Sequence, residues 1–124
     1  MSRILVCGGR DLEDSPWVYS ALAEYIHPWD TVVVGGATGA DEIAKGFAEG
    51  MGCNIVVYPA QWDRWGNAAG PIRNALMLSD GKPDFVLAFP GGRGTADMKA
   101  KAHKAGVPVV LARDNNLEAV PEKP

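Results

Sequence analysis

The chain has 124 residues and a formal net charge of −3 at pH 7, with 47% hydrophobic and 22% charged residues. This length fits one domain, and the composition is typical of a globular protein rather than a membrane protein or a disordered chain. The acidic balance argues against a nucleic-acid binder that neutralises phosphates. The first apolar run is too short for a signal sequence, so we expect a cytoplasmic protein with no nucleic-acid and no membrane partner.

Five short apolar runs predict five strands. Each run is continuous rather than alternating, which is typical of strands that are covered on both faces. The predicted strands cover residues 4–7, 31–34, 54–58, 85–89 and 107–111.

Segments with helical periodicity separate these strands. They predict helices from Pro16 to before Pro28, over residues 40–50, over residues 71–79, and from a cap at Thr95 onward. On the third helix, the side that we expect to be buried contains Ile72, Ala75, Leu76 and Ser79.

The alternation of strands and helices predicts a parallel sheet with right-handed crossovers. We expect an α/β fold, a Rossmann-like three-layer sandwich with a five-stranded parallel sheet in the order 3-2-1-4-5. Residues 1–113 would form this single domain, and residues 114–124 a polar C-terminal tail. The stretch at residues 59–70 is predicted to be an irregular connection, and its length is unusual for a loop without a function.

Three glycine-rich segments each follow a predicted strand, and we call them glycine loops 1, 2 and 3. Their sequences are GGRD at residues 8–11, GGATGAD at residues 35–41 and PGGRGTAD at residues 90–97. Glycine lets a phosphate approach the backbone closely, and the following helix N-terminus offers unpaired N–H groups. The carboxyl ends of parallel strands share one edge of the sheet, so the loops predict a phosphate-binding crevice there.

The candidate binding residues come from these loops and from the third helix. They are Gly8, Gly9, Arg10, Gly35, Gly36, Gly39, Arg73, Asn74, Gly91, Gly92, Arg93, Gly94 and Thr95. The chain contains no GxxxxGK[ST] motif, and a GxGxxG pattern that begins at Gly92 fails at Asp97. Nucleoside triphosphate hydrolysis and conventional NAD-dependent hydride transfer are therefore disfavoured.

Two motifs resemble those of the LOG phosphoribohydrolases: IRNALM at residues 72–77 and PGGRGT at residues 90–95. The wider pattern over residues 3–111 resembles the YspA-like, cpYpsA-related branch of the SLOG superfamily. The resemblance implies a Rossmann-like fold, a homodimer or higher homo-oligomer, and a small nucleotide or nucleotide-derived ligand. LOG enzymes cleave the N-glycosidic bond of a nucleoside monophosphate and release the base and ribose 5-phosphate.

The resemblance also implies roles for particular residues. Glycine loop 3 matches the phosphate-binding turn, and Arg73 matches the arginine of the other LOG motif. The glutamate of the LOG pattern PGGxGTxxE falls on Met98. A carboxylate near the sugar assists departure of the base, so Asp97, Asp41 or Asp11 would have to supply it. Asp97 and Asp41 are the leading candidates, and Arg73 is the third catalytic candidate.

Several alternatives remain open at this point. The first is a nucleotide-binding protein with N-glycosidic hydrolase activity, and the second is a non-catalytic sensor or sequestering protein for a nucleotide signal. A molybdenum cofactor carrier and a protein that handles single-stranded DNA are weaker readings. Trp62 and Trp65 could stack on a base or simply pack. Cys7 and Cys53 are expected to be buried free thiols, and no metal or cofactor is expected.

Overall fold

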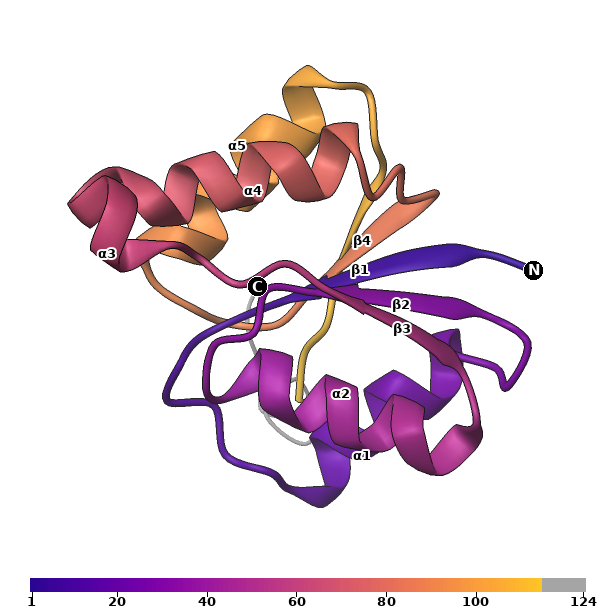
Figure 1. The fold of residues 1–124 in the computed structure, drawn as a ribbon. Helices are drawn as coiled ribbons and strands as arrows, with labels where there is room; N and C mark the ends of the chain where they lie inside the picture. Colours follow the sequence, from indigo (N-terminus) through magenta and orange to yellow (C-terminus); the bar gives the residue numbers. More distant parts are fainter. Residues whose placement is uncertain (115–124) are drawn as a thin grey trace, which may run out of the picture.

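A computed structural model describes residues 1–114 and contains one five-stranded parallel sheet in the order β3-β2-β1-β4-β5 (Figure 1). The strands are β1 (Arg3–Cys7), β2 (Thr31–Val34), β3 (Asn54–Val57), β4 (Phe85–Ala88) and β5 (Val109–Leu111). The three central strands are almost wholly buried, which explains why their sequences are continuous apolar runs. The predicted fold class and strand order are confirmed.

Helices cover both faces of this sheet (Figure 1). One face carries α1 (Pro16–Tyr25) and α2 (Ala40–Met51), and the other carries α3 (Trp62–Trp65), η1 (Gly66–Ala68), α4 (Ala69–Ser79) and α5 (Arg93–Lys104). Along β1, Ile4 and Val6 belong to the core beneath α1 and α2, while Leu5 and Cys7 belong to the core beneath α4 and α5. The alternation of side chains along a strand thus divides one buried run between two cores.

The buried face of α4 differs from the predicted one. Ile72 and Leu76 are 41% and 48% exposed, whereas Asn74 and Met77 are buried. The polar Asn74 faces inward because its side chain has partners on α5, and apolar periodicity does not register such pairing. The prediction of an inner stripe at Ile72, Ala75, Leu76 and Ser79 was therefore wrong.

Three other predicted features also differ from the structure. The predicted irregular connection at residues 59–70 contains α3, η1 and the start of α4. Thr95 is not a cap, because Gly92 holds the N-cap position of α5 and Thr95 lies in the first helical turn. Cys53 is only half-buried. Residues 115–124 of the predicted tail lie outside the described residues.

Within residues 1–114, no helix is both long enough and apolar enough to cross a membrane.

Gly39 at the N-cap of α2 has a backbone conformation that only glycine adopts easily. Its φ is +72°, and a Cβ there would overlap the carbonyl oxygens of Gly9 and Arg10. This close approach fixes the start of α2 against glycine loop 1.

We expect Gly39→Ala to lower the free energy of unfolding by about 2 kcal/mol or more, because it adds both backbone strain and steric overlap. Gly46→Ala, inside α2 with open space around it, is the matched control and should raise stability by about 0.5 to 1 kcal/mol. Urea denaturation of both variants measures the difference. Equal changes in the free energy of unfolding for the two variants would contradict the conclusion that the N-cap of α2 needs a glycine.

Candidate functional site

The three glycine loops meet at the carboxyl ends of β1, β2 and β4, where a cavity of about 1150 Å³ opens toward α4 and α5. We call it the ligand cavity. Most of the predicted site residues line it. They are Gly8, Gly9, Arg10, Gly35, Asp41, Arg73, Asn74, Gly91, Gly92, Arg93, Gly94, Thr95 and Asp97. Gly36 and Gly39 were predicted with them but do not line this cavity.

Glycine loop 1 connects the other two loops through its backbone. The N–H of Gly9 donates to the carbonyl of Pro90 at 2.8 Å, and the carbonyl of Gly9 accepts from the N–H of Ala40 at 3.1 Å. At Gly8 a Cβ would lie 2.7 Å from the Cβ of Ala40 and 2.8 Å from that of Phe89. Glycine is needed at Gly8 for packing, independently of any ligand.

The glycines of loop 3 divide into two kinds. A Cβ at Gly91 would overlap the Thr95 hydroxyl and the Gly9 nitrogen, so Gly91 is a packing glycine. At Gly92 and Gly94 a Cβ would meet nothing within 4 Å, and both residues line the ligand cavity. Their φ angles are not in the left-handed region. Neither packing nor a positive φ therefore accounts for the two glycines that face the cavity.

The N-terminus of α5 also faces the ligand cavity. Gly92 is its N-cap, and no side chain caps the helix, while the first hydrogen bond back to the N-cap comes from Ala96. The N–H groups of Arg93 and Gly94 precede that bond, and the helix dipole places partial positive charge at this end. The first turn of α5 therefore supplies donors that suit an anion.

Arg73 extends from α4 toward glycine loop 2. Its Nη1 donates to the carbonyl of Gly35, and its Nε donates to Asn74 Oδ1 at 3.0 Å. Burial lowers the pKa of the Arg73 guanidinium, and the neighbouring Asp41 opposes this shift. Arg73 thus has protein partners of its own, on loop 2 rather than on loop 3.

Asp41 lies in the first turn of α2 and is 8% exposed. Its Oδ2 accepts a hydrogen bond from the N–H of Ala37 at 3.0 Å. Burial raises the pKa of Asp41 and outweighs the lowering by this N–H and by Arg73. Burial therefore favours the protonated form of Asp41 more than water does for an ordinary aspartate.

Asp97 has the opposite environment. Lys101 donates to its Oδ1, and Asn74 Nδ2 donates to its Oδ2 at 3.0 Å. Burial would raise the pKa of Asp97, but these two hydrogen bonds outweigh it and lower the pKa. Asn74 Nδ2 also donates to the carbonyl of Gly94 at 3.2 Å. Asn74 therefore connects α4 to α5 and holds Asp97 as an ionised carboxylate.

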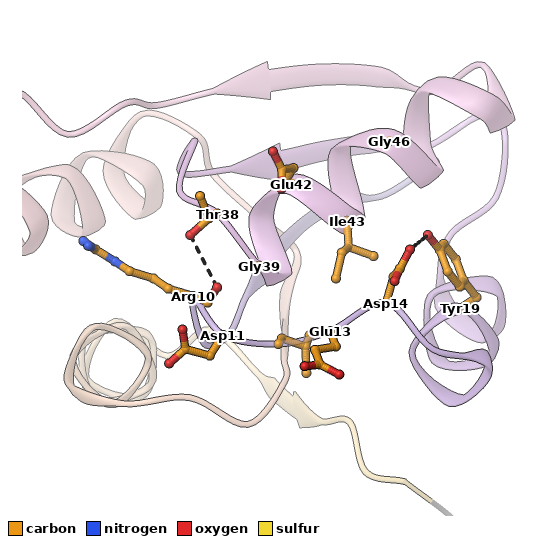
Figure 2. A pocket seen from close by; sticks show the side chains of 11 residues that line it. Arg10, Asp11, Glu13, Asp14, Tyr19, Thr38, Gly39, Glu42, Ile43 and Gly46 are labelled. Carbon is orange, nitrogen blue, oxygen red and sulfur yellow. Dashed lines mark hydrogen bonds between the residues drawn. The ribbon is translucent and has the colours of Figure 1, made fainter.

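A second, smaller pocket of about 680 Å³ shares Arg10 and Asp11 of glycine loop 1 with the ligand cavity (Figure 2). Gly39 lines this pocket, together with four acidic side chains: Asp11, Glu13, Asp14 and Glu42. Figure 2 shows the side chain of Arg10 extending away from these carboxylates. Four carboxylates and one guanidinium, that of Arg10, line this pocket, whereas three arginines and three aspartates line the ligand cavity. The ligand cavity is therefore the better place for a phosphate.

Three apolar residues that line the ligand cavity were not predicted as site residues: Cys7, Met77 and Met98. Trp62, one of the two tryptophans considered for base stacking, also lines the cavity, and Trp65 does not. Burial raises the pKa of the Cys7 thiol to about 12, so it is neutral at physiological pH and a poor nucleophile. Among the described residues, no three His, Cys, Asp or Glu side chains are grouped as metal ligands.

A model of the YspA, cpYpsA-related SLOG family matches residues 2–65, just over half of the chain. The chain belongs to this SLOG family. Gene 61 protein of Mycobacterium phage D29 is similar to it, with 43% identity over 120 residues that cover 89% of this chain and 95% of that protein. The matched segment includes glycine loops 1 and 2, whereas loop 3 and Arg73 lie beyond it. The predicted SLOG membership is confirmed, and this membership suggests a nucleotide-related ligand.

In this SLOG protein the carboxyl groups of the buried Asp41 and the half-buried Asp97 are expected to titrate apart. Asp41 should titrate above the ordinary aspartate pKa of 3.8 and Asp97 below it, for the reasons given above. Carboxyl carbon NMR across the acidic range measures both values, with Asp41→Asn and Asp97→Asn used to assign the resonances. Two ordinary titrations would contradict the described hydrogen bonds.

The pKa shifts of Asp97 and Asp41 make the stability of the protein depend on pH in opposite directions. Asp97 contributes stability that is present above its unfolded pKa and is lost as the pH falls through its lower folded pKa. The folded protein holds the proton of Asp41 more tightly than the unfolded chain does, so that contribution is lost as the pH rises through the higher folded pKa.

Proposed function

We propose that the ligand cavity binds a nucleotide or nucleotide-derived ligand, with its phosphate on glycine loop 3. The observation that carries this proposal is the open space in front of Gly92 and Gly94. Both glycines line the cavity, and neither packing nor a positive φ requires glycine there. A phosphate that approaches the backbone closely gives them a reason to be glycine.

The charges of the cavity support this placement. Arg73 is bound to the carbonyl of Gly35 beside Asp41, Asp97 is paired with Lys101, and Asp11 adds a carboxylate to the lining. Arg10 and Arg93 remain as exposed guanidinium groups in the lining, close in sequence to the glycines. Together with the N–H groups of α5 they supply positive charge for the phosphate, and guanidinium groups bind phosphate oxygens in pairs.

Gly92→Ala is expected to weaken binding of AMP at least tenfold, because the methyl group fills the space assigned to the phosphate. Gly50→Ala is the matched control, since Gly50 lies on α2, also has open space around it, and does not line the cavity. Calorimetric titration of AMP into both variants measures the effect. Unchanged affinity in Gly92→Ala would overturn the placement of the phosphate.

A second candidate function is N-glycosidic hydrolysis of a nucleoside monophosphate, and the two aspartates favour it. The carboxylate of Asp97 is held ionised and the carboxyl group of Asp41 favours its proton, which is how enzymes separate a charge-stabilising group from an acid. The bond between C1′ and the base nitrogen would break, water oxygen would bond to C1′, and a proton would pass to the base. Asp97 would stabilise the sugar cation, Asp41 would donate the proton to the base, and the proton that the attacking water loses would return to Asp41.

If this reaction occurs, incubation with AMP, CMP, GMP or NAD releases free base that chromatography detects. Asp97→Asn should then lower the rate at least tenfold while AMP still binds, because the positive charge on the sugar loses its counter-charge. Glu42→Gln, which changes a carboxylate outside the ligand cavity, should leave the rate unchanged. Binding without base release from any of these compounds would favour the sensor or sequestering protein.

A homodimer or higher homo-oligomer stays a prediction from the family resemblance. Native mass spectrometry of the purified protein measures the assembly and detects any retained nucleotide in the same spectrum.

A further inference from the structure

We infer that Trp62 recognises the planar base of the ligand by stacking, so that the ligand is a nucleotide and not a sugar phosphate. This inference rests on the proposed function. Two observations support it. The indole ring lines the ligand cavity, and the side chain of Arg10, which also lines the cavity, lies over the ring.

Trp62 is held in the wall of the ligand cavity although it remains 46% exposed. It begins the short helix α3, and its ring lies against the start of α4. A Cβ at Gly70 would lie 3.4 Å from Trp62 Cη2, so the small Gly70 gives the ring room to rest there. The ring is thus supported by α4 while nearly half of the side chain stays accessible to a ligand.

Arg10 reaches Trp62 from glycine loop 1. Its Cζ lies over the ring at 5.3 Å from the centroid, a cation–π contact between two exposed residues that both line the cavity. The backbone of Arg10 is fixed, because Gly39 packs against its carbonyl and the Thr38 hydroxyl donates to the same carbonyl at 3.4 Å. Only the side chain of Arg10 is free to move.

A base placed between the two groups needs about 3.5 Å on each side, or about 7 Å in total. The separation is 5.3 Å, so the guanidinium would have to withdraw by about 2 Å. An exposed arginine side chain can make this movement without a change in the backbone. The base would then lie between an indole ring and a guanidinium plane, and both of these stack on any nucleobase.

Trp65 provides a matched comparison on the same short helix. It is 44% exposed and also has an arginine over its ring, Arg64 at 4.8 Å from the centroid. It does not line the ligand cavity. The two tryptophans therefore resemble each other in exposure and cation contact and differ in access to the cavity.

The test compares AMP with ribose 5-phosphate in calorimetric titrations of the wild-type protein and of Trp62→Leu, Trp62→Phe and Trp65→Leu. Base stacking on an aromatic side chain contributes about tenfold or more to affinity. Trp62→Leu should weaken AMP binding by about tenfold and change ribose 5-phosphate binding less than twofold. Trp62→Phe should restore most of the AMP affinity, and Trp65→Leu should bind both ligands like the wild type.

The outcomes separate this inference from the proposed function. If the wild type binds neither compound, the proposed function fails and the stacking role fails with it. If the wild type binds both compounds but Trp62→Leu weakens the binding of both equally, or of neither, the stacking role is wrong. The placement of the phosphate on glycine loop 3 then stands. Wild-type binding of ribose 5-phosphate as tight as that of AMP also overturns the stacking role.

Discussion

The close approach of glycine loop 1 to its two neighbours determines the geometry of the ligand cavity. Gly8 packs against Ala40 and Phe89 at distances that leave no room for a Cβ, and Gly9 hydrogen-bonds to Pro90 and to Ala40. Because β1 is the central strand, its loop lies between glycine loops 2 and 3 and hydrogen-bonds to both through the backbone. The start of α2 and the entry to α5 are therefore placed relative to each other by backbone contacts.

The backbone contacts position the glycine loops, and the side chains that line the ligand cavity determine its electrostatics. Asn74 accepts from Arg73 and donates to Asp97 and to the carbonyl of Gly94, so it connects the two halves of the cavity wall. Asp41 sits beyond this network, where burial dominates its pKa. Two carboxyl groups in one cavity thus have different protonation preferences because one has cationic and amide donors and the other is chiefly desolvated.

The fold could be predicted from the sequence because its determinants are local. Continuous apolar runs such as residues 31–34 mark strands buried on both faces, and helical segments between them require parallel crossovers. Which face of α4 is buried could not be predicted in this way. It depends on Asn74 and Arg73, which are held inward by groups on α5 and glycine loop 2 that lie 20 or more residues away. Likewise, the difference between Trp62 and Trp65 depends on α3, a helix too short to show a periodic pattern.

The contact between Arg10 and Trp62 has a consequence for how fast a ligand could exchange. Two exposed side chains make this contact, and the carbonyl of Arg10 is held by Gly39 and Thr38, so the side chain of Arg10 is the part that would move. Rotamer changes of exposed side chains take picoseconds to nanoseconds, whereas loop and domain closures take microseconds to milliseconds. Entry and release would then follow the concentration of the ligand almost without delay, and residence time would be set by the strength of the contacts alone.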